Sequence, residues 1–499
     1  MELRSNDTSP ANLDRADWLN PTPLGRYNLV VIGGGGAGVV SALSTAALQG
    51  RVALIEPDRP GHDIPSIACV PSQALVRAES DRNGSQNEFA LTIERLRRLQ
   101  TEIRRRESPW RLTGCGVDVY RGEPHFTGPN QLEVSGTPLE FDRAIVATGS
   151  RPATSNYPGL GEVGFQTSDS IFSLENLPRT LVVIGGGSSA CELAQTFRRF
   201  GSEVHLLADA DGILPNEERR AAAIVQAQFQ REGIRIHLGA TVVAAGKTGR
   251  SKSIVVEQQG RKLELIADEI LVAIGREPNT DDLGLDVAGV RFSPAGIEVN
   301  ERLQTSNPSI FAAGDVCASF PRTGDVDAIA RVCVQNAMFF SRQRISQLAI
   351  PHCTYTDPQL AQVGLTLAEA DRRDIEVDTY RVELSDVDRA IVDGDQRGFV
   401  ALYTRRGGSR VVGATIVAAH AGEMIGQISL LMSRRLPISA LSEMSHCRPT
   451  ESEAFLRAAD QYQRRRLTPR VKRLLDRWFA WRRRPRPAAT RQPAVIDPS

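Results

Sequence analysis

The sequence predicts an α/β protein with two similar three-layer domains followed by a smaller α+β domain. Three observations support this prediction. A buried strand, a glycine-rich turn and a helix follow one another from Tyr27, and the same order returns from Thr180. After about Pro351 the pattern changes to short alternating segments and a helix-rich end. The 499 residues suffice for about three to four domains.

The composition narrows the class of protein. Apolar residues make up 41% and charged residues 24%, which is typical of a globular chain. A net charge of +1 argues against a uniformly basic surface, so no nucleic-acid partner is expected. Seven cysteines are too few for a disulfide scaffold, and the first 25 residues lack a secretory pattern. We therefore expect a cytoplasmic, reduced protein.

The first motif is a nucleotide-binding fingerprint. Tyr27–Ile32 is a short apolar run that predicts a buried parallel strand, and a helical pattern extends to about Gly50. Between them lies G-x-G-x-x-G, in which glycines allow a tight turn and the close approach of a pyrophosphate to a helix N-terminus. A second strand ends at Glu56, which can accept hydrogen bonds from a ribose. The glycines of this first fingerprint are Gly33, Gly35, Gly36 and Gly38.

The second half of the chain repeats the plan. Thr180–Ile184 is a predicted strand, a helix runs to about Phe200, and Glu203–Leu207 is the next strand. Two such Rossmann-like units imply two nucleotides that communicate, and the simplest pair is a flavin and a nicotinamide. Further glycine turns follow strands in ATGSRP, IGREPN and AAGDV. The residues of the second fingerprint are Gly185, Gly187 and Ala190, and those of the turns are Thr148, Gly149, Gly275, Gly314 and Asp315.

The order of these motifs, with HCTYTDPQLAQVGLT opening the last domain, resembles the pyridine nucleotide–disulfide oxidoreductases, and mercuric-reductase-like members most. The resemblance implies a homodimer that binds FAD and NADH or NADPH. It places the adenosine at Glu56 and the ribityl chain near Asp315. It also implies a dimerisation domain at the carboxyl end. The expected division is 1–25 flexible arm, 26–152 and 273–348 FAD-binding domain, 153–272 NAD(P)-binding domain, 349–460 dimerisation domain and 461–499 basic tail.

The sequence departs from the family at its redox disulfide. The family motif has the form GG-T-C-x-N-x-G-C-x-P-S-K. Here Ile64 occupies the first cysteine position, Cys69 the second, and Ser72 is followed by Gln73 instead of lysine. No other cysteine lies nearby in sequence, so a local disulfide is excluded. In the family that lysine pairs with the glutamate matching Glu192, and Gln73 loses its charge near the flavin.

A second departure concerns proton transfer. The resemblance implies a histidine–glutamate pair in a motif H-P-T-x-x-E, donated by the other subunit. Arg448 occupies the histidine position and Glu453 is retained. Arginine does not release its proton near neutral pH, so Arg448 either holds an anion or pairs with Glu453. His446 would need a register change to replace the missing base.

Two readings of Cys69 remain open. A lone thiolate beside a flavin can form a charge-transfer contact, a sulfenic acid or a mixed disulfide. Alternatively, Cys69 is a small buried residue, and an intersubunit pair with Cys447 is conceivable. No metal site is expected, and mercury reduction is disfavoured because soft metals need two or more thiolates. For the nicotinamide, Ala190 favours NADPH, whereas Asp209 and Asp211 would repel a 2′-phosphate and favour NADH.

The carboxyl end carries most of the positive charge. From Tyr462 onward there are eleven arginines and one lysine against two aspartates, a net of +10, which leaves −9 elsewhere. Thr468 and Pro469 predict a helix start, and Pro485 its end. Apolar residues with helical spacing suggest contact with the inner membrane face. Packing on the dimer body and nucleic-acid contact are alternatives. The stripe comprises Val471, Leu474, Leu475, Trp478, Phe479 and Trp481.

Three functions follow. The first is an FAD-dependent NAD(P)H oxidoreductase that passes hydride to a quinone or oxygen without a redox disulfide. The second is a non-catalytic flavoprotein that serves as a scaffold. Ile64, Gln73 and Arg448, which replace the first cysteine, the lysine and the histidine of the family, would favour this function. The third is a single-thiol reductase that uses Cys69. We predict the first, with Cys69, Arg448 and Glu453 as its candidate catalytic residues.

Overall fold

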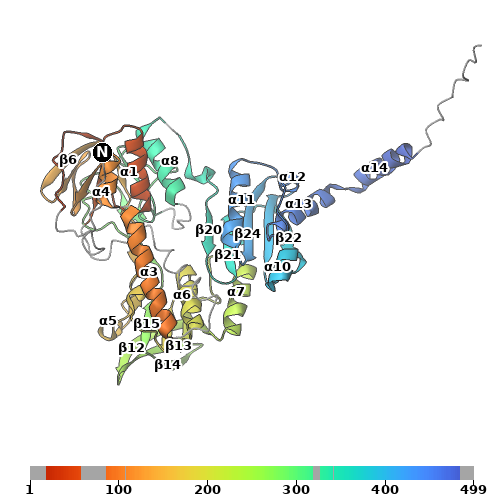
Figure 1. The fold of residues 1–499 in the computed structure, drawn as a ribbon, viewed down its shortest axis with the longest axis horizontal. Helices are drawn as coiled ribbons and strands as arrows, with labels where there is room; N and C mark the ends of the chain where they lie inside the picture. Colours follow the sequence, from red (N-terminus) through yellow and green to blue (C-terminus); the bar gives the residue numbers. More distant parts are fainter. Residues whose placement is uncertain (1–17, 58–85, 107, 319–325, 341, 484–499) are drawn as a thin grey trace, which may run out of the picture.

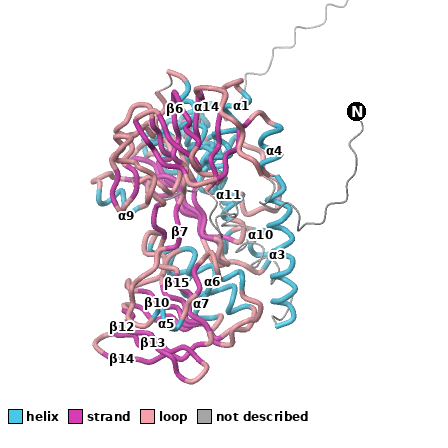
Figure 2. The backbone as a smooth tube through the Cα atoms, turned by 90° about the vertical axis from the view of Figure 1, so that its left-hand side faces the viewer, coloured by secondary structure: helices cyan, strands magenta, loops and turns pink. Residues whose placement is uncertain are grey.

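The computed structural model describes residues 18–57, 86–106, 108–318, 326–340 and 342–483. Figure 1 shows the amino-terminal sheet at one end of α3, a second sheet domain at the other end, and the carboxyl-terminal domain beside them. Figure 2 gives the same arrangement from the side.

The first domain is built on a seven-stranded sheet with β1 at its centre. The order is β3-β2-β1-β6-β5-β4, and β19 also pairs with β6. Leu29 and Val31 face the core beneath the helices, whereas Val30 and Ile32 face the core on the other side, which explains why the whole run is apolar. The elements are β1 (Tyr27–Ile32), α1 (Gly36–Ala47), β2 (Val52–Glu56), α4 (Pro109–Gly114), β3 (Val117–Arg121), β4 (Pro124–Gly128), β5 (Gln131–Val134), β6 (Thr137–Val146), β17 (Phe292–Ser293), β18 (Gly296–Ile297), β19 (Ile310–Ala312), α8 (Val326–Met338) and η4 (Ile345–Gln347).

The second domain repeats this design. Its parallel sheet has the order β11-β10-β9-β15-β8, and the antiparallel sheet β12-β13-β14 lies beside it. Leu181 and Val183 face one core, and Val182 and Ile184 face the other. The elements are α5 (Leu160–Val163), β8 (Gln166–Thr167), η3 (Ile171–Ser173), β9 (Thr180–Ile184), α6 (Ser188–Arg199), β10 (Glu203–Ala208), α7 (Arg219–Arg231), β11 (Arg235–Leu238), β12 (Ala240–Thr248), β13 (Ser251–Gln258), β14 (Arg261–Ala267) and β15 (Glu269–Val272).

The two glycine turns that resemble each other in sequence lie side by side in the fold. β7 (Ser150–Pro152) follows the first turn and β16 (Arg276–Pro278) the second, and the two strands pair antiparallel. Both chain crossings between the domains therefore run through one two-stranded ribbon.

The carboxyl-terminal domain is a five-stranded antiparallel sheet, β20-β21-β24-β23-β22, covered by helices. Pro358, which cannot donate to a ladder, lies between the end of β20 and the start of β21. The elements are β20 (Pro351–Thr354), β21 (Gln359–Gly364), α9 (Leu367–Arg372), β22 (Val377–Glu383), η5 (Leu384–Asp386), α10 (Asp388–Asp393), β23 (Phe399–Arg405), β24 (Val411–Ala418), α11 (Ala421–Ser433), α12 (Ala440–Glu443) and α13 (Glu453–Arg466).

The helix α3 (Gln86–Arg106) packs one face on the second domain. Phe89 and Leu96 are buried on that face, with the centroid of the Phe89 ring 5.7 Å from that of Phe197, whereas Leu91 is exposed. At the amino end, Asn20 exchanges two hydrogen bonds with the Arg121 backbone, at 2.8 and 2.7 Å, and so holds part of the expected arm against the first domain.

The tail helix α14 (Pro469–Arg482) begins as expected, with the Thr468 hydroxyl accepting from the Val471 amide. The expected end at Pro485 lies outside the described residues. α14 has no buried residue and projects away from the body in Figure 1. Among the described residues, no helix has both the length and the apolarity needed to cross a bilayer.

Candidate functional site

The first fingerprint forms a tight turn between β1 and α1. Gly33 has φ +112°, and a Cβ there would lie 2.3 Å from the Ala147 carbonyl oxygen. A Cβ on Gly38 would lie 1.8 Å from the Gly33 oxygen. The helix starts at Gly36 with Gly35 as its N-cap and no side-chain cap. The first amide groups of α1 are therefore not satisfied by a capping side chain and suit a phosphate.

Glu56 ends β2 next to this turn. A Cβ built on Gly34 would lie 3.0 Å from the Glu56 carboxyl carbon, so the acid adjoins the glycine loop as predicted for a ribose contact. On the other side, Gly314 has φ +86°, and a Cβ built there would lie 3.8 Å from the Ala37 Cβ of α1. The Ser150 hydroxyl donates to Asp315 at 2.7 Å. Predicted cofactor residues from three separate segments therefore surround the start of α1.

The second fingerprint reproduces the geometry of the first. Gly185 has φ +128°, and a Cβ there would lie 2.2 Å from the Ala273 oxygen. Gly187 is the uncapped N-cap of α6, and a Cβ there would meet no heavy atom within 4 Å. Open space in front of free helix amides fits a pyrophosphate. Ala190, in place of the third glycine, is fully buried in the domain core.

Thr148 and Gly149 join the two nucleotide-binding domains. The Thr148 hydroxyl donates to the Asn279 carbonyl at 2.7 Å, and the Asn279 amide donates to the Gly149 carbonyl at 3.0 Å. In the matching turn, the Gly275 carbonyl accepts from Ala153 at 2.9 Å. Asn279 was part of the IGREPN motif but was not predicted as a site residue.

Glu192 lies on α6 and faces the carboxyl-terminal domain. Its carboxylate accepts the Tyr355 amide at 2.9 Å, and the neighbouring Ser188 hydroxyl meets that of Thr354 at 3.1 Å. The family resemblance places Glu192 beside Gln73. Gln73, Cys69 and Ser72, together with Ile64, lie outside the described residues, so their roles stay predictions.

Arg448 and Glu453 are brought together only loosely. Their charged atoms are 4.0 Å apart, and the Arg448 side chain is 61% exposed. Glu453 is buried, and Arg457 on the same helix is its close partner at 2.8 Å. The second carboxylate oxygen, Oε2, is buried and has no hydrogen-bond partner among the described residues. Arg457 was missed from the sequence, although its spacing of four from Glu453 is typical of a helical ion pair.

Two other expected participants lie apart from this pair. The His446 ring Nε2 lies 3.3 Å from the Leu441 carbonyl oxygen, and Cys447 is exposed. Another histidine, His420, contacts the buried Glu451 at 3.0 Å. This pair was also missed, because His420 belongs to no motif, Glu451 occupies a variable position of H-P-T-x-x-E, and 31 residues separate the two.

The comparisons with known proteins agree with this arrangement. Residues 27–344 match the family model described as pyridine nucleotide-disulphide oxidoreductase, and residues 350–459 match the dimerisation domain of that family. The chain belongs to the pyridine nucleotide-disulphide oxidoreductase family. Members of this family bind FAD and use NAD(P)H, and the dimerisation domain supports a homodimer.

The alignments with several relatives span most of both chains. The chain is 34% identical to a mercuric reductase of Acidithiobacillus ferrooxidans, with 90% of this chain and 85% of the relative covered. It is 30% identical to a dihydrolipoyl dehydrogenase of Thermus scotoductus, with 87% and 97% covered. The solved structure of the HOCl-induced flavoprotein disulfide reductase RclA from Escherichia coli has a TM-score of 0.77 at 25% identity, with 86% and 98% covered.

The described residues fit both cofactors of the family. Each of the two uncapped helices follows a tight turn whose first glycine, Gly33 or Gly185, has no space for a side chain. Glu56 and Asp315 flank the first turn and would hold FAD. Gly187 leaves room at the second turn, where NAD(P)H would bind.

Proposed function

We propose that this protein is an FAD-dependent NAD(P)H oxidoreductase that passes hydride to a quinone without a redox disulfide. The observation that carries the proposal is a contrast. Both nucleotide-binding turns keep glycines at positive φ, Gly33 and Gly185, whereas the disulfide motif holds Ile64 in place of its first cysteine. When bound, FAD supplies the ring that accepts hydride from the nicotinamide and passes it on.

Retention of the cradles argues against the scaffold alternative. Gly33 and Gly185 lie at φ values that side chains rarely adopt, and a Cβ at either would collide with the backbone. A protein that no longer bound nucleotides would not need Gly187, at which a Cβ meets nothing. The motif supplies a single thiol, Cys69, whereas a dithiol–disulfide cycle needs two, so the motif of one subunit cannot carry out that cycle.

We infer that NADH is the preferred donor. Asp209 and Asp211 follow β10 directly, and both are exposed. This position is where the adenosine ribose lies in a Rossmann unit, and two carboxylates there repel a 2′-phosphate. Replacement of Asp209 by arginine should shift the preference toward NADPH.

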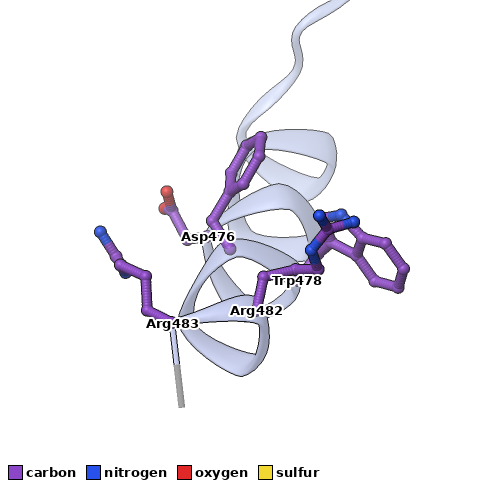
Figure 3. Close-up of a pocket in the computed structure, with 5 residues that line it drawn as sticks. Asp476, Trp478, Arg482 and Arg483 are labelled. Carbon is purple, nitrogen blue, oxygen red and sulfur yellow. The ribbon is translucent and has the colours of Figure 1, made fainter. Parts of the chain in front are cut away.

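We further propose that α14 brings this protein to the cytoplasmic face of a membrane, where quinones are dissolved. Its apolar side chains are exposed: Leu474 by 67%, Trp478 by 50% and Trp481 by 58%. Figure 3 shows Trp478 and Arg482 on one side of the helix. The shallow hollow around them is formed by a single helix, so it cannot enclose a small molecule. Arginines flanking exposed tryptophans favour an anionic lipid surface.

The decisive experiment separates the two half-reactions. The purified holoenzyme is mixed with NADH without air, and the flavin absorbance is followed. Rapid bleaching, followed by recovery on addition of 1,4-naphthoquinone, is the expected result. A protein that holds FAD but is not bleached by NADH is no oxidoreductase. Recovery that requires Cys69, tested with Cys69→Ser, would favour the single-thiol reductase instead.

A further inference from the structure

A cavity of about 290 Å³ lies in the dimerisation domain, between α10, α11 and the chain after Arg448. This volume approaches the lower end of the range for small-molecule sites, roughly 300 Å³. The lining is mixed, with four side chains able to carry charge, Arg389, His420, Glu423 and Glu451, beside hydroxyl, amide and apolar groups. The side chains used below are Arg389, His420, Met424, Gln427, Pro449 and Glu451.

One wall of the cavity holds a histidine in a fixed orientation. Glu451 is only 6% exposed, and its Oε2 atom accepts from the His420 backbone amide at 3.2 Å. The same oxygen lies 3.0 Å from the His420 ring Nδ1. A carboxylate only accepts hydrogen bonds, so Nδ1 carries the hydrogen. The ring therefore has one settled tautomer, in which Nε2 is the nitrogen that exchanges protons.

The surroundings of this pair suit a small polar ring. Arg389 on α10 lines the same cavity and pairs with Asp393 at 2.6 Å. Gln427 donates to the Ser452 hydroxyl at 3.2 Å, while its Oε1 atom is buried and unpartnered among the described residues. Met424 and Pro449 provide apolar contacts. A lining that combines hydrogen-bonding groups with apolar contacts suits a ring with carbonyl or hydroxyl groups.

We propose that His420, oriented by Glu451, is the proton donor to a small quinone that occupies this cavity. The proposal rests on the function proposed above. Reduction of a quinone to a quinol takes one hydride and one proton. When both cofactors are bound, NADH and FAD would supply the hydride, which would form a bond to the quinone. The donor is the imidazolium form of His420: its Nε2–H bond breaks, and the proton forms an O–H bond on the quinone. The neutral imidazole keeps its Nδ1–H bond to Glu451 and recovers a proton from water.

The kinetic test uses His420→Gln in the dimeric holoenzyme, because hydride transfer requires bound FAD. Glutamine keeps a hydrogen-bond donor for Glu451 but cannot transfer a proton. Reoxidation by 1,4-naphthoquinone should slow by roughly 10²-fold, the usual contribution of a general acid, while flavin reduction by NADH stays unchanged. His125→Gln is the matched control, since His125 lies in the first domain and contacts the Asp282 carbonyl.

A second readout needs no turnover. In protein labelled with ¹⁵N-histidine, the neutral form of the His420 ring should carry its hydrogen on Nδ1 and leave Nε2 bare, and Glu451→Gln should abolish this preference. Addition of 1,4-naphthoquinone should shift the Nε2 signal. An unslowed His420→Gln enzyme, or a protonated Nε2 in the neutral ring, would overturn the proposal. A wild-type enzyme whose flavin is bleached by NADH but is not reoxidised by quinone would instead overturn the proposed function.

Discussion

Thr148 and Asn279 exchange hydrogen bonds across the junction of the two nucleotide-binding domains. The Thr148 hydroxyl donates to the Asn279 carbonyl at 2.7 Å, and the Asn279 side-chain amide returns one to the Thr148 carbonyl at 2.9 Å. Because both domain crossings run through the β7–β16 ribbon, this exchange fixes one nucleotide cradle relative to the other.

Removing the hydrogen bonds between Thr148 and Asn279 should lower the free energy of unfolding. Asn279 is 8% exposed, so Asn279→Ala leaves the Thr148 carbonyl without its side-chain donor at a largely buried junction. We expect a loss of about 1–3 kcal/mol in unfolding free energy, measured in urea, and slower flavin reduction. The comparison is Arg406→Ala, whose exposed ion pair with Glu376 should cost less than about 1 kcal/mol. Equal losses in the two variants would contradict the assigned role of Asn279.

The two glycines of the second fingerprint should behave differently. A side chain at Gly185 would collide with the Ala273 carbonyl, so Gly185→Ala should unfold or fail to express. Gly187→Ala meets no protein atom and should cost at most about 1 kcal/mol. Its methyl group would enter the space assigned to the pyrophosphate. We expect the Kd for NADH, measured by fluorescence, to rise at least roughly tenfold. Unchanged NADH affinity would mean that the cofactor lies elsewhere.

A histidine pair should make this protein sensitive to acid. His205 and His237 stack on neighbouring strands, with Nδ1 and Nε2 at 3.1 Å. Burial lowers the pKa of both rings. The charges of His237 and Arg235 lower the pKa of His205 further, and Glu203 opposes them. Below pH 6.5, the usual histidine pKa, the unfolded chain therefore binds more protons than the folded chain, and stability falls.

The variant His237→Gln isolates this effect. It should lose less unfolding free energy than the wild type when the pH falls from 7 toward 5, because one buried titrating ring is gone. Thermal unfolding followed by circular dichroism at each pH measures the difference. Parallel curves for the two proteins would show that the pair does not titrate on folding.

The tail helix should bind anionic vesicles. Trp478→Ala combined with Trp481→Ala should lower sedimentation with phosphatidylglycerol-containing vesicles by at least roughly tenfold, and added salt should weaken binding of the wild type. Trp110→Ala removes an exposed tryptophan of the body and should have no effect. Sedimentation that the double variant does not alter, or a preference for nucleic acid over vesicles, would reject the membrane proposal.

The local parts of the fold could be predicted from the sequence. β1 and β9 begin and end at the predicted residues, because an apolar run followed directly by a glycine turn leaves little choice. The start of α14 was also predicted, since a threonine cap followed by proline is a short-range signal. These features depend on residues that are adjacent in sequence.

The parts that depend on distant residues could not be predicted. Phe89 turns toward Phe197 because a whole helix packs across two domains, and the helical spacing of its leucines gives no sign of this. The His420–Glu451 pair joins a helix start to a loop, so only the packed structure brings it together.

The number of electrons that the holoenzyme accepts tests the central claim most directly. A flavin without a redox disulfide takes up two electrons, whereas a flavin coupled to a disulfide takes up four. Anaerobic titration with dithionite, followed by flavin absorbance and by counting free thiols, measures this uptake. We predict an end point of two electrons per flavin, with no thiols released and the same end point in Cys69→Ser. Four electrons per flavin, with two new thiols, would contradict the account.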